Sequence, residues 1–253
     1  MGARCITGIG YFGMDKCATM KIAIIADIHG NVVALKNCLL FIKEQQVDDM
    51  YFLGDAVGYL PFAQGVICVL QDEKIKCIKG NHEAMLLGDL PVLAANREVY
   101  KLSQAKESMA AAELAFIKTW GISHEIILDD KKITMMHGSP LDYLNGYVYP
   151  DTDLELFAGM PADVIVCSHT HYPFVKNHNG KLFINAGSVG LPRDCGNLSS
   201  VAIYDSVAEN AAIYRIPFIT DVFFASNITY KIHPTVLECL LRKKESCTGN
   251  LIN

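Results

Sequence analysis

The sequence predicts an α/β protein in which two β-sheets pack together between outer helices. Three observations lead to this fold class. Short, apolar and β-branched runs recur along the chain, the first three are separated by helical patterns, and after residue 133 the runs follow one another through short turns. Runs separated by helices indicate parallel βαβ units, whereas short turns indicate antiparallel pairing. We therefore expect parallel strands first and a more antiparallel second half.

Eight runs are predicted to be buried strands, because each is short, apolar and bounded by turn residues. They are Lys21–Ala26, Met50–Leu53, Lys74–Ile78, Ile133–Met136, Asp163–Cys167, Lys181–Ile184, Ser200–Tyr204 and Ala211–Ile216. Helical periodicity covers Val32–Gln45 and Gln64–Gln71 between the first three strands. A mixed polar and apolar stretch over residues 84–120 predicts one or two helices inserted as a small cap.

Length and charge limit the class of protein. A chain of 253 residues, 51% of them hydrophobic, suffices for one large domain, which we place at residues 20–253. The 22 Lys and Arg against 27 Asp and Glu leave a net charge of -5, which argues against nucleic acid and anionic lipid as partners. The apolar runs are also shorter than the roughly 20 residues that a membrane span needs.

The N-terminal stretch and the cysteines carry no sign of secretion. Residues 1–19 lack an apolar core of signal-peptide length, and we expect them to be a disordered leader or a misassigned start before Met20. The nine cysteines fall singly, with no Cys-x-x-Cys pair. This spacing predicts reduced thiols in a cytoplasmic protein, with no assigned role for Cys195.

Metal-competent side chains follow nearly every predicted strand. They are Asp27, His29, Asp55, Asn81, His82, His137, His169 and His171. Because ligands bind at the carboxyl ends of strands in α/β sheets, these side chains should converge on one rim. Taken singly, each motif could be a turn, a helix N-cap or a core histidine. The convergence of five of the eight histidines on these strand ends favours a metal site.

Six motifs in this order resemble the calcineurin-like metallophosphoesterases, especially their small bacterial and archaeal phosphodiesterases. They read Asp27-Ile28-His29-Gly30-Asn31, Gly54-Asp55-Ala56-Val57-Gly58-Tyr59, Gly80-Asn81-His82-Glu83, His137-Gly138-Ser139-Pro140, Ser168-His169-Thr170-His171 and Asn185-Ala186-Gly187-Ser188-Val189-Gly190. The resemblance extends from Lys21 to about Arg215. It implies a four-layer α/β/β/α sandwich of two mixed sheets with a small helical cap insertion.

The resemblance also implies two divalent metal ions bridged by Asp55. The first would be held by Asp27, His29, Asp55 and His171, and the second by Asp55, Asn81, His137 and His169. Nitrogen and oxygen ligands without thiolate suit Mn, Fe, Zn, Ni or Co. In such a binuclear centre a metal-bridging hydroxide attacks phosphorus, and His82 is the candidate general acid for the leaving oxygen.

Three residues are candidates for substrate binding. Asn31 closes the first motif, and Arg193 lies in the loop that follows the last one. Arg193 could bind a phosphate or be a solvated loop arginine. Tyr143, followed by Tyr147 and Tyr149, could stack on a base or an aryl leaving group, or could simply pack its loop.

The sequence therefore predicts a metal-dependent phosphodiesterase that acts on a small phosphate ester. One alternative is a phosphomonoesterase or a protein Ser/Thr phosphatase, but those phosphatases continue the second motif into Asp-Arg-Gly where this chain has Gly58-Tyr59-Leu60. The chain thus lacks the arginine that would clamp a phosphate there. The other alternative is a non-catalytic scaffold like the retromer subunit of the same fold, which would have no need of His82. The oligomeric state is not predicted.

Overall fold

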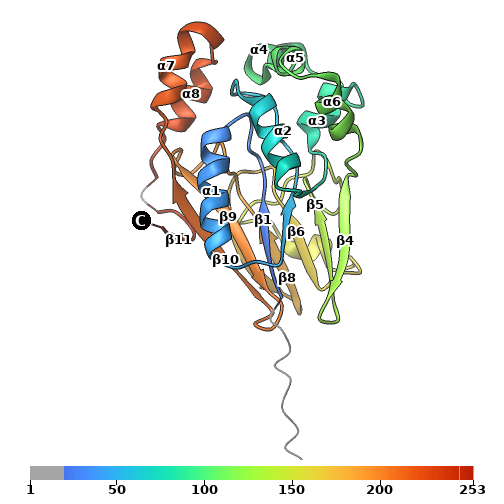
Figure 1. Ribbon diagram of the computed structural model, residues 1–253. Helices are drawn as coiled ribbons and strands as arrows, with labels where there is room; N and C mark the ends of the chain where they lie inside the picture. The colour runs from blue at the N-terminus through green and yellow to red at the C-terminus, as the bar shows by residue number, and fades with distance from the viewer. Residues whose placement is uncertain (1–19, 245, 253) are drawn as a thin grey trace, which may run out of the picture.

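The computed structural model describes residues 20–244 and 246–252, so the predicted leader at residues 1–19 lies outside the described residues. Two mixed β-sheets form the body of the molecule, with helices α1 and α2 in front of the first sheet (Figure 1). The predicted α/β class with two mixed sheets is confirmed. In the described part of the chain, no helix is both long enough and apolar enough to cross a membrane.

The first sheet has the strand order β11-β10-β9-β1-β2-β3. Its strands are β1 (Lys21–Ile25), β2 (Asp49–Phe52), β3 (Lys76–Cys77), β9 (Leu198–Asp205), β10 (Asn210–Pro217) and β11 (Asn250–Leu251). The first three are parallel and are joined by α1 (Val32–Glu44) and α2 (Ala63–Asp72), as the βαβ spacing predicted. β9 is antiparallel to β1, and β10 is antiparallel to β9.

The second sheet has the strand order β4-β5-β6-β8-β7. Its strands are β4 (Ser123–Leu128), β5 (Lys131–Met136), β6 (Val164–Cys167), β7 (Phe174–His178) and β8 (Lys181–Asn185). The three central strands are parallel, and the edge strands β4 and β7 are antiparallel. The sequence did not predict the two edge strands, because their half-exposed faces interrupt the apolar run that marks a buried strand.

The remaining helices lie at the ends of the sheets. The stretch predicted to be helical, residues 84–120, overlaps the end of α3 (Asn81–Leu87). It also contains η1 (Ala94–Asn96), α4 (Arg97–Tyr100), α5 (Leu102–Glu107) and α6 (Ala111–Lys118), which are shorter and more numerous than the one or two helices expected. After β10 the chain forms α7 (Asp221–Tyr230) and α8 (Pro234–Leu240). A single 3-10 turn, η2 (Leu154–Phe157), follows β5.

Three apolar clusters separate the layers. Along β1, Ala23 and Ile25 pack toward α1 and α2, while Ile22 and Ile24 pack toward the second sheet. The outer face of the second sheet is covered by η2 and its flanking loops, whose Leu154 and Phe157 complete the third cluster. The fourth layer of the sandwich is therefore thin, with a 3-10 turn in place of long helices.

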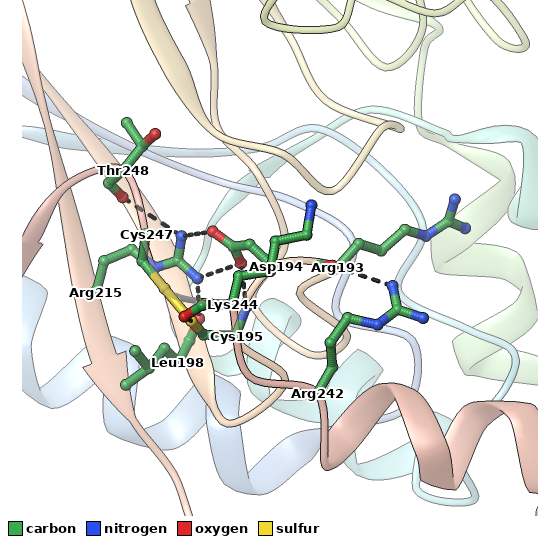
Figure 2. Close-up of a disulfide and its surroundings, with 9 residues drawn as sticks. All are labelled: Arg193, Asp194, Cys195, Leu198, Arg215, Arg242, Lys244, Cys247 and Thr248. Carbon is green, nitrogen blue, oxygen red and sulfur yellow. Dashed lines mark hydrogen bonds and ion pairs between the residues drawn. A yellow bond between two sulfur atoms is a disulfide. The ribbon is translucent and has the colours of Figure 1, made fainter.

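The prediction that the cysteines are reduced thiols is wrong for Cys195 and Cys247, which form a disulfide (Figure 2). The two residues are 52 positions apart in the sequence, and the segment after α8 returns to the loop that follows β8. Gly196 N donates to Arg242 O at 2.8 Å where the two segments meet. The cytoplasmic location predicted from cysteine spacing stays a prediction, and this disulfide removes part of its basis.

Candidate metal centre

The loops after β1 and β2 run side by side beyond the ends of their strands. Asp27 N donates to Gly54 O at 2.9 Å, and His29 N donates to Asp55 O at 2.9 Å. These bonds continue the parallel pairing of the sheet, so that Asp27, His29 and Asp55 meet at its carboxyl edge.

A close approach between two glycines brings α3 to the same edge. Gly54 has φ +93°, and a Cβ there would lie 2.2 Å from Gly80 N. The loop after β2 can therefore touch the start of α3 only because neither position carries a side chain. In this arrangement His82 N donates to Asp55 Oδ1 at 2.9 Å.

Five of the predicted metal ligands have left-handed backbone conformations. Their φ values are 52° for Asp27, 49° for His29, 63° for Asp55, 66° for His169 and 62° for His171. Each such residue costs about 1–3 kcal/mol, and strain of this kind gathers where function requires a particular side-chain direction. Here it turns the side chains back from the strand ends into one cluster.

The first group of side chains contains His29, His171 and Asp27, all fully or almost fully buried. His29 Nδ1 donates to Val57 O at 3.2 Å, and His171 Nδ1 donates to Leu191 O at 2.6 Å. Their Nε2 atoms are then both acceptors, yet they face each other at 3.2 Å. Asp27 Oδ1 lies 3.8 Å and 3.5 Å from these two nitrogens.

The second group contains His137, His169 and Asp55, with Asn81 beside it. His137 Nδ1 donates to Leu53 O at 2.8 Å, which directs its Nε2 toward the other members of the group. That Nε2 lies 3.0 Å from His169 Nδ1, 3.2 Å from Asn81 Oδ1 and 3.4 Å from Asp55 Oδ2. Nitrogen and oxygen atoms that can bind a metal thus converge on one point in this group as well.

Asp55 Oδ2 faces both groups, because it lies 3.7 Å from His29 Nε2 and 3.4 Å from His137 Nε2. Buried acceptors that face one another repel unless a cation lies between them. The backbone carbonyls that fix the Nδ1 protons of the imidazoles are the partners usually found behind metal-binding histidines. The residues present therefore fit divalent cations.

The same burial perturbs the titration of the cluster. Burial raises the pKa of Asp27 to about 8, and it lowers the pKa of His171 well below the usual range. Burial also lowers the pKa of His137, but the Asp55 carboxylate outweighs it and raises this pKa to about 9. In the absence of metal, protons thus take up part of the charge that cations would supply.

His82 lies at the edge of the cluster with its Nε2 3.9 Å from Asp55 Oδ2. Its ring contacts Tyr59 and Tyr100, with centroids at 4.9 Å and 4.6 Å. Its buried Nδ1 has no hydrogen-bond partner, and a Cβ on Gly58 would lie 2.3 Å from that atom. Burial lowers the pKa of His82, so that the ring is neutral at pH 7 until an anion favours its protonated form.

Of the three predicted substrate residues, only Arg193 lies beside the cluster, since Arg193 N donates to His171 O at 3.5 Å. Asn31 is fully buried and caps α1, because its Oδ1 accepts from Ala34 N and its Nδ2 donates to Gly190 O, both at 2.9 Å. The structure thus gives Asn31 a structural place rather than one open to substrate.

Tyr143 also lies elsewhere than predicted. It packs against the apolar cluster beneath η2, and its carbonyl accepts from Gly138 N at 2.7 Å. The tyrosine at the rim is Tyr147, whose ring centroid lies 4.4 Å from that of His169 and whose ring stacks on Tyr149. Sequence spacing alone could not tell these tyrosines apart, because the loop after β5 has no periodic pattern.

Glu83 is a further residue of the site, to which sequence reasoning gave no role. Its buried carboxylate accepts from Asp55 N at 2.7 Å, Ala56 N at 2.8 Å, Gly80 N at 2.8 Å and Val57 N at 3.3 Å. Burial raises its pKa to about 7, while these four donors favour the ionised form. Its place three residues after Gly80 is the capping-box position, which is the signal that could have identified it.

The fold and the buried cluster of His and Asp side chains define a metal-dependent enzyme that acts on phosphate esters. Residues 20–209 match the model of the calcineurin-like phosphoesterase superfamily domain. The chain therefore belongs to the calcineurin-like phosphoesterase superfamily, as its motifs indicated.

Similar proteins span most of the chain. An uncharacterised protein of Methanocaldococcus jannaschii is 29% identical over 214 residues, which are 78% of this chain and 87% of that protein. A hypothetical protein of Pyrococcus horikoshii OT3 superimposes with a TM-score of 0.80 at 17% identity, covering 90% of this chain and 100% of the other. A metallophosphoesterase from Sphaerobacter thermophilus gives a TM-score of 0.72 at 24% identity, covering 87% and 98%. At these sequence identities, the similarity to the two solved structures shows that this chain shares their fold.

The contacts of Glu83 predict that Glu83→Gln weakens metal binding about 10- to 100-fold, as is typical when a partner behind the ligands is lost. The new amide would direct donors at backbone N–H groups and loosen the Asp55 loop. Calorimetric titration with Mn²⁺ measures the effect.

Glu113→Gln is the matched control, because Glu113 also occupies the third position of a helix and accepts from Ala110 N at 2.7 Å, away from the cluster. Equal metal affinities for the two variants would contradict the positioning role of Glu83.

Proposed function

We propose that this protein is a phosphodiesterase with a binuclear metal centre. The observation that carries the proposal is the position of Asp55, whose Oδ2 faces two separate groups of buried side chains that can bind a metal ion. A carboxylate in that position can bridge two cations, and centres with two divalent ions are suited to phosphoryl transfer.

The ligand sets follow the two groups. Asp27, His29, Asp55 and His171 would hold one ion, and Asp55, Asn81, His137 and His169 would hold the other. This set of nitrogen and oxygen donors suits Mn, Fe, Zn, Ni or Co, with manganese as our choice for assays. When bound, two such ions supply a hydroxide nucleophile at neutral pH and neutralise charge on the phosphoryl oxygens.

His82 is the proposed general acid. Its Nε2 is the ring atom directed toward the cluster, and contacts with Tyr59 and Tyr100 hold the ring in that direction. A bound phosphate anion favours the protonated ring, which then donates to the leaving oxygen. His82 would thus be the proton donor beside the site of bond cleavage.

Charge favours a diester as the substrate. Two divalent ions carry four positive charges, of which Asp27, Asp55 and a hydroxide balance three, leaving about one. That remainder matches the single charge of a phosphodiester. A monoester dianion would need another cation, and Arg193 beside His171 is the residue that supports this second candidate function.

The charge balance predicts that kcat/KM for bis-nitrophenyl phosphate exceeds that for nitrophenyl phosphate by about 10-fold, or about 1.4 kcal/mol, with Mn²⁺ at neutral pH. Steady-state kinetics of the wild type and Arg193→Ala measure this preference. A preference for the monoester in the wild type would contradict the argument. If the wild type prefers the monoester and Arg193→Ala does not, Arg193 replaces the phosphate-binding arginine that the second motif lacks, and the enzyme is a phosphatase.

The bridging position predicts that Asp55→Asn lowers the occupancy of both ions, whereas Asn81→Ala retains roughly one of the two. Elemental analysis of purified protein gives the metal content. Asn37→Ala on α1 is the control, because it makes the same substitution at an asparagine whose Nδ2 donates to Pro217 O, away from the cluster. Equal loss of both ions in Asn81→Ala would count against the two ligand sets.

The place of His82 predicts that His82→Ala keeps its metals and loses about 10²- to 10⁴-fold in rate for an alkyl leaving group, as for other general acids. Nitrophenolate needs no proton, so its rate should fall far less. His178→Ala is the control. His178 lies on β7 and forms an ion pair with Glu155 on η2, outside the cluster. An equal loss for both leaving groups would assign His82 to substrate positioning.

A further inference from the structure

The C-terminal segment after α8 returns to the rim of the metal centre. Arg242 O accepts from Gly196 N at 2.8 Å, and Cys247 is joined to Cys195 by the disulfide. Figure 2 shows this segment alongside the loop that carries Arg193. It lies beyond residues 20–209, the stretch that matches the superfamily. This element of the rim therefore lies outside the superfamily match.

That element brings two cationic side chains to the surroundings of His171. Arg242 Nη1 donates to Arg193 O at 3.1 Å, and Arg193 N donates in turn to His171 O. The guanidinium groups of both arginines extend to the same side, away from the disulfide (Figure 2). Lys244 Nζ lies 3.3 Å from the hydroxyl of Tyr172, the residue after His171, and 4.5 Å above its ring.

The acidic residue of the same loop does not balance these charges. Asp194 is buried and forms a bidentate ion pair with Arg215, at 2.6 Å and 2.8 Å. Among residues 20–244 and 246–252, no carboxylate forms an ion pair with Arg193, Arg242 or Lys244.

Three cationic residues thus lie on two neighbouring segments beside His171 and Tyr172, on a chain whose net charge is -5. Like charges held near one another repel, and a bound anion relieves that repulsion. Arginine is also the side chain best suited to bidentate phosphate binding. The arrangement is typical of an anion site rather than of a solvated surface, on which charges of both signs alternate.

We propose that Arg193, Arg242 and Lys244 form a second anion subsite, which binds a phosphate group of the substrate other than the one that is hydrolysed. The inference rests on the proposed phosphodiesterase function and specifies its substrate class. With two divalent ions bound, the centre would retain about one positive charge, enough for the scissile diester. The three further cations therefore match a phosphoester that carries an additional phosphate.

The test compares two nucleotides that differ by one phosphate, thymidine 5′-monophosphate and thymidine 3′,5′-bisphosphate. Neither nucleotide contains a phosphodiester, so under the proposed function binding is measured without hydrolysis. Calorimetric titration of the Mn²⁺-loaded wild type should show the bisphosphate binding at least about 10-fold more tightly, as expected for charge-assisted hydrogen bonds. The double variant Arg242→Gln/Lys244→Gln should lose this difference.

Two further variants make the comparison specific. Lys36→Gln removes one charge from the exposed face of α1 and should keep the preference for the bisphosphate. Cys247→Ser should reduce the preference, because Arg242 and Lys244 lie between α8 and the disulfide that holds their segment. Circular dichroism establishes that each variant is folded.

Equal affinities of the wild type for the two nucleotides, or an undiminished preference in the folded double variant, would overturn the subsite. Failure of the proposed function has a different signature. If the wild type binds the bisphosphate preferentially but does not hydrolyse bis-nitrophenyl phosphate, the anion subsite is supported and the phosphodiesterase function is contradicted.

Discussion

Buried hydrogen-bond acceptors that face one another without donors are the constraint on which the rest of this structure depends. The Nε2 atoms of His29 and His171 lie 3.2 Å apart, and the buried Oδ1 of Asp27 beside them has no hydrogen-bond partner. Such an arrangement is unfavourable in an apolar interior unless cations complete it. Membership of a metal-dependent superfamily accounts for it, since the cations supply the charge that the protein interior lacks.

The surrounding fold holds these groups in positions that an isolated loop would not adopt. Left-handed residues follow the strands, and the hydrogen bonds between the loops after β1 and β2 hold their backbone in place. Glu83 ties one of these loops to the start of α3 through four backbone donors. The two sheets, with apolar clusters on both faces of β1, supply the rigidity that stores this strain.

The metal centre and its rim have different origins in the chain. All the proposed ligands fall within the stretch that matches the superfamily, whereas Arg242 and Lys244 come from the segment after it. Rims built from loops can change without disturbing the rigid centre beneath them. A disulfide joins the C-terminal segment to the loop after β8, and the buried ion pair between Asp194 and Arg215 joins that loop to β10. The chemistry and the choice of substrate can therefore be separate properties of this molecule.

The sequence by itself determined the buried strands, the two connecting helices and the residue types at the strand ends, because periodicity and short motifs are local features. Only the tertiary structure decided that Asn31 caps a helix, that Tyr147 rather than Tyr143 lies at the rim, and that Cys195 pairs with Cys247. Each of these depends on contacts between segments far apart in the chain or on the path of an irregular loop. No local pattern records such contacts, since they arise only when the sheets and the C-terminal segment pack together.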